Sequence, residues 1–197
     1  MLEPVACRRV DRSGMLGIVQ SLPQQLLDGY RAAEAVRIEI EAPARLFIAG
    51  MGGSAIAGDL FVSWAADRSK VAMEVVRGYS LPPYAAAQDL LVAVSYSGDT
   101  EETLAAVREG AKRKCRIVAI TSGGKLADWA QRNGARVVRV PPKFPPRGAF
   151  GYLFSALPAV TEDCVYGDLG SELERAAAHL SRLAQEYRVA TPSKSIQ

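Results

Sequence analysis

The sequence contains few residues that could form disulfides or bind a transition metal. Among its 197 residues are three cysteines and one histidine. Cys7, Cys115 and Cys164 have no CxxC spacing and are odd in number, which argues against a zinc site or a disulfide framework. Because no secretory signal precedes them, we expect reduced thiols and a cytoplasmic protein. We expect neither a metal nor a cofactor.

The sequence also lacks a strong charge of one sign and a long apolar run. The net charge is +3, and the basic residues are dispersed, so we expect no nucleic-acid partner. No apolar stretch approaches the length of a membrane span, so we expect no membrane association. A composition of 49% hydrophobic and 23% charged residues indicates one globular domain.

Short apolar runs alternate with helical patterns along the middle of the chain. Such alternation predicts an α/β fold: an open, mainly parallel five-stranded sheet flanked by helices, a flavodoxin- or Rossmann-like three-layer sandwich. The predicted strands are residues 45–49, 71–76, 90–94, 116–121 and 135–140. The main helices are predicted after these strands, at residues 56–64, from 101 to the basic cluster at 112–116, at 126–133 and at 149–160, the last buried against the sheet.

The two ends of the chain have helical patterns. We predict a helical lead-in within residues 1–40, the α/β domain at 41–165, a C-terminal helix within 166–190, and a linker or frayed end at 191–197. His179 lies in the C-terminal helix. A lone helical histidine is more often exposed or packed than catalytic, so we do not assign it a role.

A loop rich in hydroxyls follows the third predicted strand. It contains Ser95, Ser97, Gly98 and Thr100, and Glu101 and Glu102 then begin a helix. At a strand end and a helix N-terminus, free N–H groups and hydroxyls favour an anion, here a phosphate monoester. The alternative is an ordinary capping box, which uses the same residue types.

A glycine-rich turn follows the first predicted strand, and a second short one, Ser122-Gly123-Gly124, follows the fourth. The first turn, GMGGSA at residues 50–55, lacks the Lys-Ser/Thr ending of a P-loop and fits the GxGxxG/A dinucleotide fingerprint only loosely. That fingerprint also needs an acidic residue at the end of the second strand, but this strand ends at Arg77, and Glu74 inside it is a weak candidate. A nucleotide site therefore stays open.

A proline-stiffened loop, PPKFPPRG at residues 141–148, precedes the last buried helix of the domain. Rigid prolines and a helix start flank Arg147, so its guanidinium could be directed at a ligand. The alternative is an ordinary surface arginine.

Taken together, four motifs resemble the sugar isomerase (SIS) domain, and more closely the first half of the bifunctional phosphoglucose/phosphomannose isomerases of archaea and bacteria. These motifs are FIAGMGGS (47–54), SYSGDTEET (95–103), TSGG (121–124) and PRGA (146–149). The lead-in, with LPQQ at 22–25, is also similar to the opening helix of that family.

The resemblance implies an aldose–ketose isomerase acting on hexose 6-phosphates. By this resemblance, the substrate phosphate is bound by Ser95, Ser97 and Thr100, with Gly53 and Ser54 lining the adjoining side. Arg147 would stabilise the enediolate. Family members have two SIS domains in tandem, and the second domain and the other subunit supply a glutamate, a histidine and a lysine for acid–base catalysis.

These acid–base residues have no counterpart in the sequence, because Glu101 and Glu102 are better explained as helix-start residues. Three hypotheses follow. The first is an isomerase that is complete as an oligomer or needs a second domain. The second is a sugar-phosphate-binding module without catalysis, and the third is a nucleotide-binding domain. We expect a hexose 6-phosphate as ligand and a homodimer or a partner SIS domain.

Overall fold

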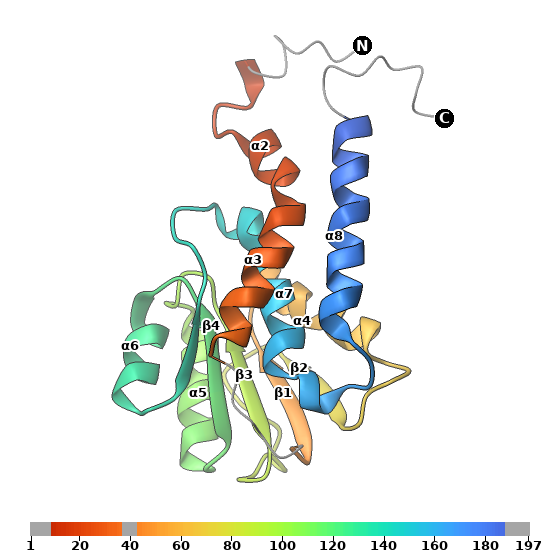
Figure 1. The fold of residues 1–197 in the computed structure, drawn as a ribbon. Coiled ribbons are helices and arrows are strands. Elements are labelled where there is room, and N and C mark those ends of the chain that lie inside the picture. Colours follow the sequence, from red (N-terminus) through yellow and green to blue (C-terminus); the bar gives the residue numbers. More distant parts are fainter. Residues whose placement is uncertain (1–8, 37–42, 188–197) are drawn as a thin grey trace.

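The protein is described here from a computed structural model, which covers residues 9–36 and 43–187. The predicted linker or frayed end at 191–197 lies outside these residues, as do parts of the predicted lead-in. The described residues include a five-stranded sheet in which every neighbouring pair of strands is parallel. Figure 1 shows the sheet with helices on both sides. The strands are β1 (Arg45–Ala49), β2 (Ala72–Val76), β3 (Leu90–Val94), β4 (Arg116–Thr121) and β5 (Arg136–Arg139).

The order of the strands is β2-β1-β3-β4-β5, which is the flavodoxin-like order. The predicted fold class is therefore confirmed. The bounds of β1, β3 and β4 agree with the prediction, whereas β2 and β5 are shorter than predicted, by one residue and by two. These two strands form the edges of the sheet, where each has only one neighbour to extend its hydrogen bonding.

Helices cover both faces of the sheet. Helices α5 (Glu101–Lys112) and α6 (Gly124–Arg132) pack on one face, against a buried cluster that includes Leu91 and Ala93 of β3. Helices α3 (Leu22–Glu34), α4 (Gly52–Trp64) and α7 (Phe150–Val160) pack on the other face, against a cluster that includes Leu90 and Val92. Successive residues of β3 therefore contact opposite layers, and the strand is apolar throughout because both of its faces are buried.

The described part of the N-terminal lead-in contains the separate helices α2 and α3, where the sequence suggested one helix. Helix α2 spans Met15–Gln20, and α3 begins directly after Ser21 with Pro23 in its first turn. The carboxylate of Asp11 begins α2 by accepting hydrogen bonds from the backbone N–H groups of Met15 (2.7 Å) and Leu16 (2.8 Å).

Helix α3 packs very closely on the buried helix α7. An added Cβ at Gly29 would lie 2.3 Å from the Ser155 Oγ and 2.8 Å from the Tyr152 carbonyl oxygen. Gly151 is similarly close to Gln25. A glycine on each helix therefore allows the lead-in to pack directly on the domain. The predicted burial of α7 is confirmed.

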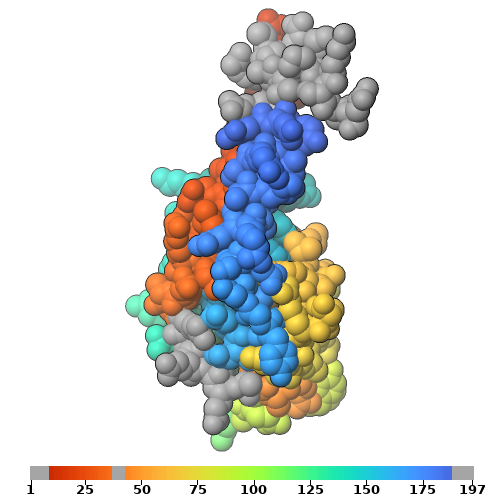
Figure 2. Space-filling view, turned by 45° about the vertical axis from the view of Figure 1, so that its right-hand side comes forward, coloured from red at the N-terminus to blue at the C-terminus, as the bar shows by residue number. Residues whose placement is uncertain are grey.

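Helix α8 (Leu169–Glu186) runs beside α3, and both project beyond the sheet (Figure 1). In the space-filling view α8 lies over the surface between α3 and α4 (Figure 2). Arg68 donates two hydrogen bonds to the Glu172 carboxylate, at 2.5 and 2.9 Å, and Trp64 Nε1 donates a third at 3.2 Å. The bonds from Arg68 lower the pKa of Glu172 and join α8 to the end of α4.

Within residues 9–36 and 43–187, none of the helices combines the length and the apolar character that crossing a membrane requires.

Candidate functional site

A cavity of about 340 Å³ lies at the edge of the sheet where the strands end. It is formed by the turns after β1 and β3, which are neighbours in the sheet although the chain passes through β2 between them. In parallel α/β sheets such a switch in strand order opens a crevice that binds ligands. The cavity is lined by Met51, Gly52, Gly53, Ser54, Tyr96, Ser97, Thr100, Pro146 and Arg147.

The turn after β1 presents the N-terminus of α4 to this cavity. The helix begins at Gly52, four residues before the predicted start at Ile56, so Gly53 and Ser54 belong to its first turn. An added Cβ at Gly50 would lie 3.1 Å from the Val94 carbonyl oxygen, so the glycine allows the ends of β1 and β3 to approach closely. No side chain caps this helix. The N–H groups of Ser54 and Ala55 donate to the Met51 carbonyl, whereas those of Gly52 and Gly53 are available to an anion.

The serine loop, residues 95–100, presents the N-terminus of α5 beside that of α4. Thr100 is the N-cap residue of α5, yet its side chain makes no capping hydrogen bond. Its hydroxyl instead pairs with that of Ser95 at 2.9 Å. The loop is therefore not an ordinary capping box, and two uncapped helix N-termini meet at one cavity.

Five of the six predicted site residues line this cavity: Gly53, Ser54, Ser97, Thr100 and Arg147. Ser95 does not line it, because its side chain is buried beneath the loop. The Ser95 Oγ accepts a hydrogen bond from the Gly98 N–H at 3.1 Å, so this hydroxyl fixes the shape of the loop. That the other hydroxyls bind phosphate stays a prediction.

The turn after β4, residues 122–124, holds the serine loop in place by hydrogen bonds and close packing. Ser122 donates two hydrogen bonds to the Tyr96 carbonyl, from its backbone N–H (3.0 Å) and its hydroxyl (2.7 Å). Gly98 has φ +76°, and an added Cβ there would lie 1.9 Å from the Gly123 carbonyl oxygen. Asp99 accepts a hydrogen bond from the Lys125 N–H at 3.2 Å, so its carboxylate serves α6 and not the cavity.

Arg147 provides the positive charge of the site. It lies in a 3₁₀ turn, Pro146–Ala149, that follows the proline-stiffened loop. Within the described part of the chain its guanidinium pairs with no carboxylate, so its charge is available to a ligand. The described residues that line the cavity include no carboxylate, imidazole or amine. Glu101 and Glu102 lie on α5 outside it, and His179 is exposed on α8.

Tyr96 is a cavity residue that sequence reasoning missed. Its neighbours Ser95 and Ser97 suggested a loop of hydroxyl donors, and the tyrosine between them carried no separate signal. Its hydroxyl reaches the proline-stiffened loop, where it donates to the Pro141 carbonyl (3.0 Å) and accepts from the Phe144 N–H (2.8 Å). Only the folded chain brings these segments together, because 45 to 48 residues separate them in sequence.

The nucleotide hypothesis gains no support from Glu74. This residue lies inside β2, two positions before the strand ends, and its carboxylate accepts a hydrogen bond from the Tyr84 hydroxyl at 2.5 Å. A ribose-binding acid is expected at the carboxyl end of the second strand.

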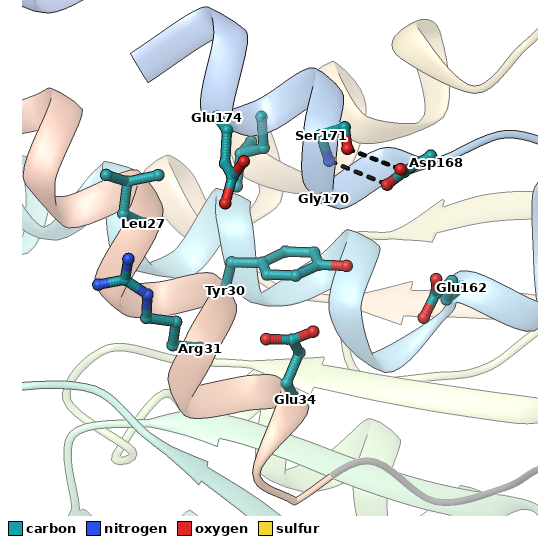
Figure 3. A pocket seen from close by; sticks show the side chains of 10 residues that line it. Leu27, Tyr30, Arg31, Glu34, Glu162, Asp168, Gly170, Ser171 and Glu174 are labelled. Carbon is teal, nitrogen blue, oxygen red and sulfur yellow. Dashed lines mark hydrogen bonds between the residues drawn. The ribbon is translucent and has the colours of Figure 1, made fainter. Parts of the chain in front are cut away.

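A second cavity, of about 240 Å³, lies between α3 and the start of α8 (Figure 3). Figure 3 shows the Tyr30 ring in its centre, with Glu34 and Glu174 on opposite sides. Asp168 begins α8 by accepting hydrogen bonds from Ser171, which lower the pKa of its carboxyl group. Four carboxylates line this cavity, those of Glu34, Glu162, Asp168 and Glu174. The lining includes one guanidinium, that of Arg31. Its charge is unsuited to a phosphate.

The fold and the first cavity define a parallel α/β protein with a crevice at the switch in strand order, lined by groups that suit an anion. The sequence model of the SIS domain matches residues 39–136. The chain belongs to this family, which confirms the resemblance inferred from its motifs.

Two known proteins that are similar to this chain have names that specify a phosphorylated sugar. The bifunctional phosphoglucose/phosphomannose isomerase of Caldicellulosiruptor bescii is 33% identical over 183 residues, which cover 91% of this chain and 54% of that protein. The D-glucosamine-6-phosphate 4-epimerase of Sulfolobus acidocaldarius is 35% identical over 109 residues, covering 55% of this chain and 34% of that protein.

Among solved structures, the tagatose-6-phosphate ketose/aldose isomerase of Escherichia coli has a similar fold. The TM-score is 0.66 at 19% identity, over 87% of this chain and 53% of that chain. The present chain thus spans about half the length of the Caldicellulosiruptor protein that it matches.

Proposed function

We propose that this chain binds the phosphate group of a hexose 6-phosphate and supplies part of an aldose–ketose isomerase site. The reaction would interconvert glucose 6-phosphate or mannose 6-phosphate with fructose 6-phosphate. The observation that carries the proposal is the meeting of two uncapped helix N-termini, the Ser97 and Thr100 hydroxyls and one guanidinium at a single cavity.

The two named relatives support the phosphate part of this proposal. Their reactions differ, since one is an isomerase and the other a 4-epimerase, but both names specify a phosphorylated sugar. A shared phosphate subsite with differing chemistry at the sugar explains this pair.

Arg147 would act at the other end of the substrate. A base removes a proton from C2 of the aldose, and the carbonyl oxygen at C1 takes up the negative charge. The hydroxyl proton then moves from the oxygen at C2 to the oxygen at C1, and the first proton returns to C1 to give the ketose. A guanidinium that faces the developing enediolate stabilises this charge only as it forms, which lowers the barrier.

The base itself would come from elsewhere. The described cavity residues offer no group that can accept a proton at neutral pH. We therefore propose that a second SIS domain or a second copy of this chain completes the site. A homodimer and a cytoplasmic location remain predictions, and the mass of the chain in solution tests the first.

The missing base also favours a second candidate, a sugar-phosphate-binding module without catalysis. A coupled assay for conversion of fructose 6-phosphate, with Arg147→Ala beside the unchanged chain, tests whether a second copy completes the site. For such an isomerase we expect turnover that falls about a hundred- to a thousandfold in the variant, the usual loss for a group that stabilises an oxyanion. Binding of fructose 6-phosphate without turnover would exclude that arrangement, and it is the result expected both of the module and of a half-site that a second SIS domain completes.

A further inference from the structure

Tyr96 connects the two walls of the candidate cavity. Its backbone belongs to the serine loop, and its side chain reaches across to the proline-stiffened loop that precedes Arg147. The hydroxyl donates to the Pro141 carbonyl oxygen at 3.0 Å and accepts from the Phe144 N–H at 2.8 Å. The phenol thus uses both its donor and its acceptor capacity on one loop.

The loop that Tyr96 holds has a conformation that needs support. Lys143, between the two residues bound to Tyr96, has φ +72°, a left-handed conformation that is unfavourable for a residue with a side chain. Such residues persist where their surroundings fix them. The Tyr96 hydrogen bonds on either side of Lys143 provide this support. The Phe144 ring also makes an edge-on contact with the Tyr152 ring, with 5.5 Å between the ring centroids.

The chain on the far side of Arg147 is also fixed. An added Cβ at Gly148 would lie 2.7 Å from a methyl carbon of Ile18, so this residue is packed tightly against α2. Arg147 itself is exposed and lies between Phe144 and Gly148. The placement of its guanidinium therefore depends on the anchor at Phe144 and on the contact at Gly148.

We propose that Tyr96 is a positioning residue, which holds Arg147 at a set distance from the serine loop. This inference rests on the proposed function and adds to it. The site would favour ligands with two anionic ends, a phosphate at the serine loop and a negative charge at Arg147. The enediolate of a phosphorylated sugar has this charge pattern, whereas the substrate has only the phosphate.

Two ligands that differ only at the sugar's far end test the proposal. 5-Phospho-D-arabinonate has a carboxylate there, and D-arabinitol 5-phosphate has an uncharged hydroxymethyl group. For each variant of the chain, the ratio of the two dissociation constants, measured by titration calorimetry, reports the contact with Arg147. We expect the unchanged chain to prefer the carboxylate ligand by at least about tenfold, the scale of a hydrogen bond between charged groups.

The informative variant is Tyr96→Phe, which keeps the ring and removes the hydroxyl. We expect this preference to fall by about threefold to tenfold, because a misplaced guanidinium binds the carboxylate less well. Affinity for D-arabinitol 5-phosphate should fall much less than that for the carboxylate ligand, and its binding also shows that the variant is folded. Tyr152→Phe is the matched control: its ring contacts the same loop through Phe144, and we expect the preference to be unaltered.

A double-mutant cycle links the effect to Arg147. Arg147→Ala should abolish the preference for the carboxylate, and adding Tyr96→Phe should then change nothing further. The inference is overturned if Tyr96→Phe leaves the preference intact, weakens both ligands equally, or adds to the loss in Arg147→Ala. It is also overturned if the unchanged chain binds both ligands with equal affinity. Failure of that chain to bind either ligand would instead refute the proposed function, and the inference with it.

Discussion

Replacing Gly98 by alanine tests the packing that supports the serine loop. The residue has φ +76°, and a Cβ would lie 1.9 Å from the Gly123 carbonyl oxygen and 2.9 Å from the Thr121 Oγ1. The left-handed conformation alone costs an alanine about 1 to 2 kcal/mol. Because the nearest contact is with backbone, relief requires the loop or the turn at 122–124 to move, for about 1 to 3 kcal/mol more.

The chain offers a control that separates the cost of the steric clash from the cost of the left-handed conformation. Gly134 has a similar φ of +68° but no atom within 4 Å of an added Cβ. Gly134→Ala should therefore lose only the about 1 to 2 kcal/mol of the backbone conformation. We expect Gly98→Ala to lose about 2 to 5 kcal/mol in total, a large part of the stability of an ordinary domain.

Urea unfolding followed by circular dichroism measures both variants against the unchanged chain. The difference between the two losses is the free energy of the clash, which we expect to be at least about 1 kcal/mol. Equal losses in Gly98→Ala and Gly134→Ala would refute the conclusion that the serine loop is packed against the turn at 122–124.

Three further changes have distinct expected outcomes. Gly53→Ala should leave stability unchanged or higher, since no neighbouring atom opposes the methyl group, but should weaken fructose 6-phosphate binding; unaltered affinity by calorimetry would contradict the site. Lys114→Gly should raise the free energy of unfolding by about 0.5 to 1 kcal/mol, because Lys114 follows α5 with φ +63°. Lys112→Gly should lower it, because Lys112 is the last residue of α5 and has a helical backbone. Glu172→Gln should cost about 1 kcal/mol at neutral pH by urea unfolding. Because the native pKa of Glu172 is lowered, this cost should shrink as the pH falls below its ordinary value of 4.5, and a cost independent of pH would contradict the role of Arg68.

The central strands could be predicted from the sequence because burial on both faces requires continuous apolar runs. The run Leu90–Val94 is buried at every position, and its bounds were predicted correctly. Along the edge strand β2, exposed and partly buried residues alternate up to the buried Val76, so its pattern gives a less definite start. Strand order and the resulting crevice depend on contacts between distant segments, which no local pattern records.

The site was predictable by residue type but not by orientation. Three glycines in four residues suggested a turn up to Ile56. Helix α4 nevertheless begins at Gly52, because this residue has φ +52°, which glycine adopts freely and which lets the chain turn directly into the helix. Ser95 and Ser97 have the same chemistry, and only the folded loop shows that Ser95 is buried while Ser97 faces the cavity. The division into a lead-in, an α/β domain and a C-terminal helix stays a prediction.

The most direct test of the phosphate site is the affinity of the chain for fructose 6-phosphate, measured by calorimetry with Ser97→Ala and Ser63→Ala beside it. Ser97 lines the cavity, whereas Ser63 is an exposed serine near the far end of α4. We expect saturable binding to the unchanged chain and to Ser63→Ala, and binding at least about tenfold weaker to Ser97→Ala. Equal affinity in all three proteins, or no binding to the unchanged chain, would contradict the account.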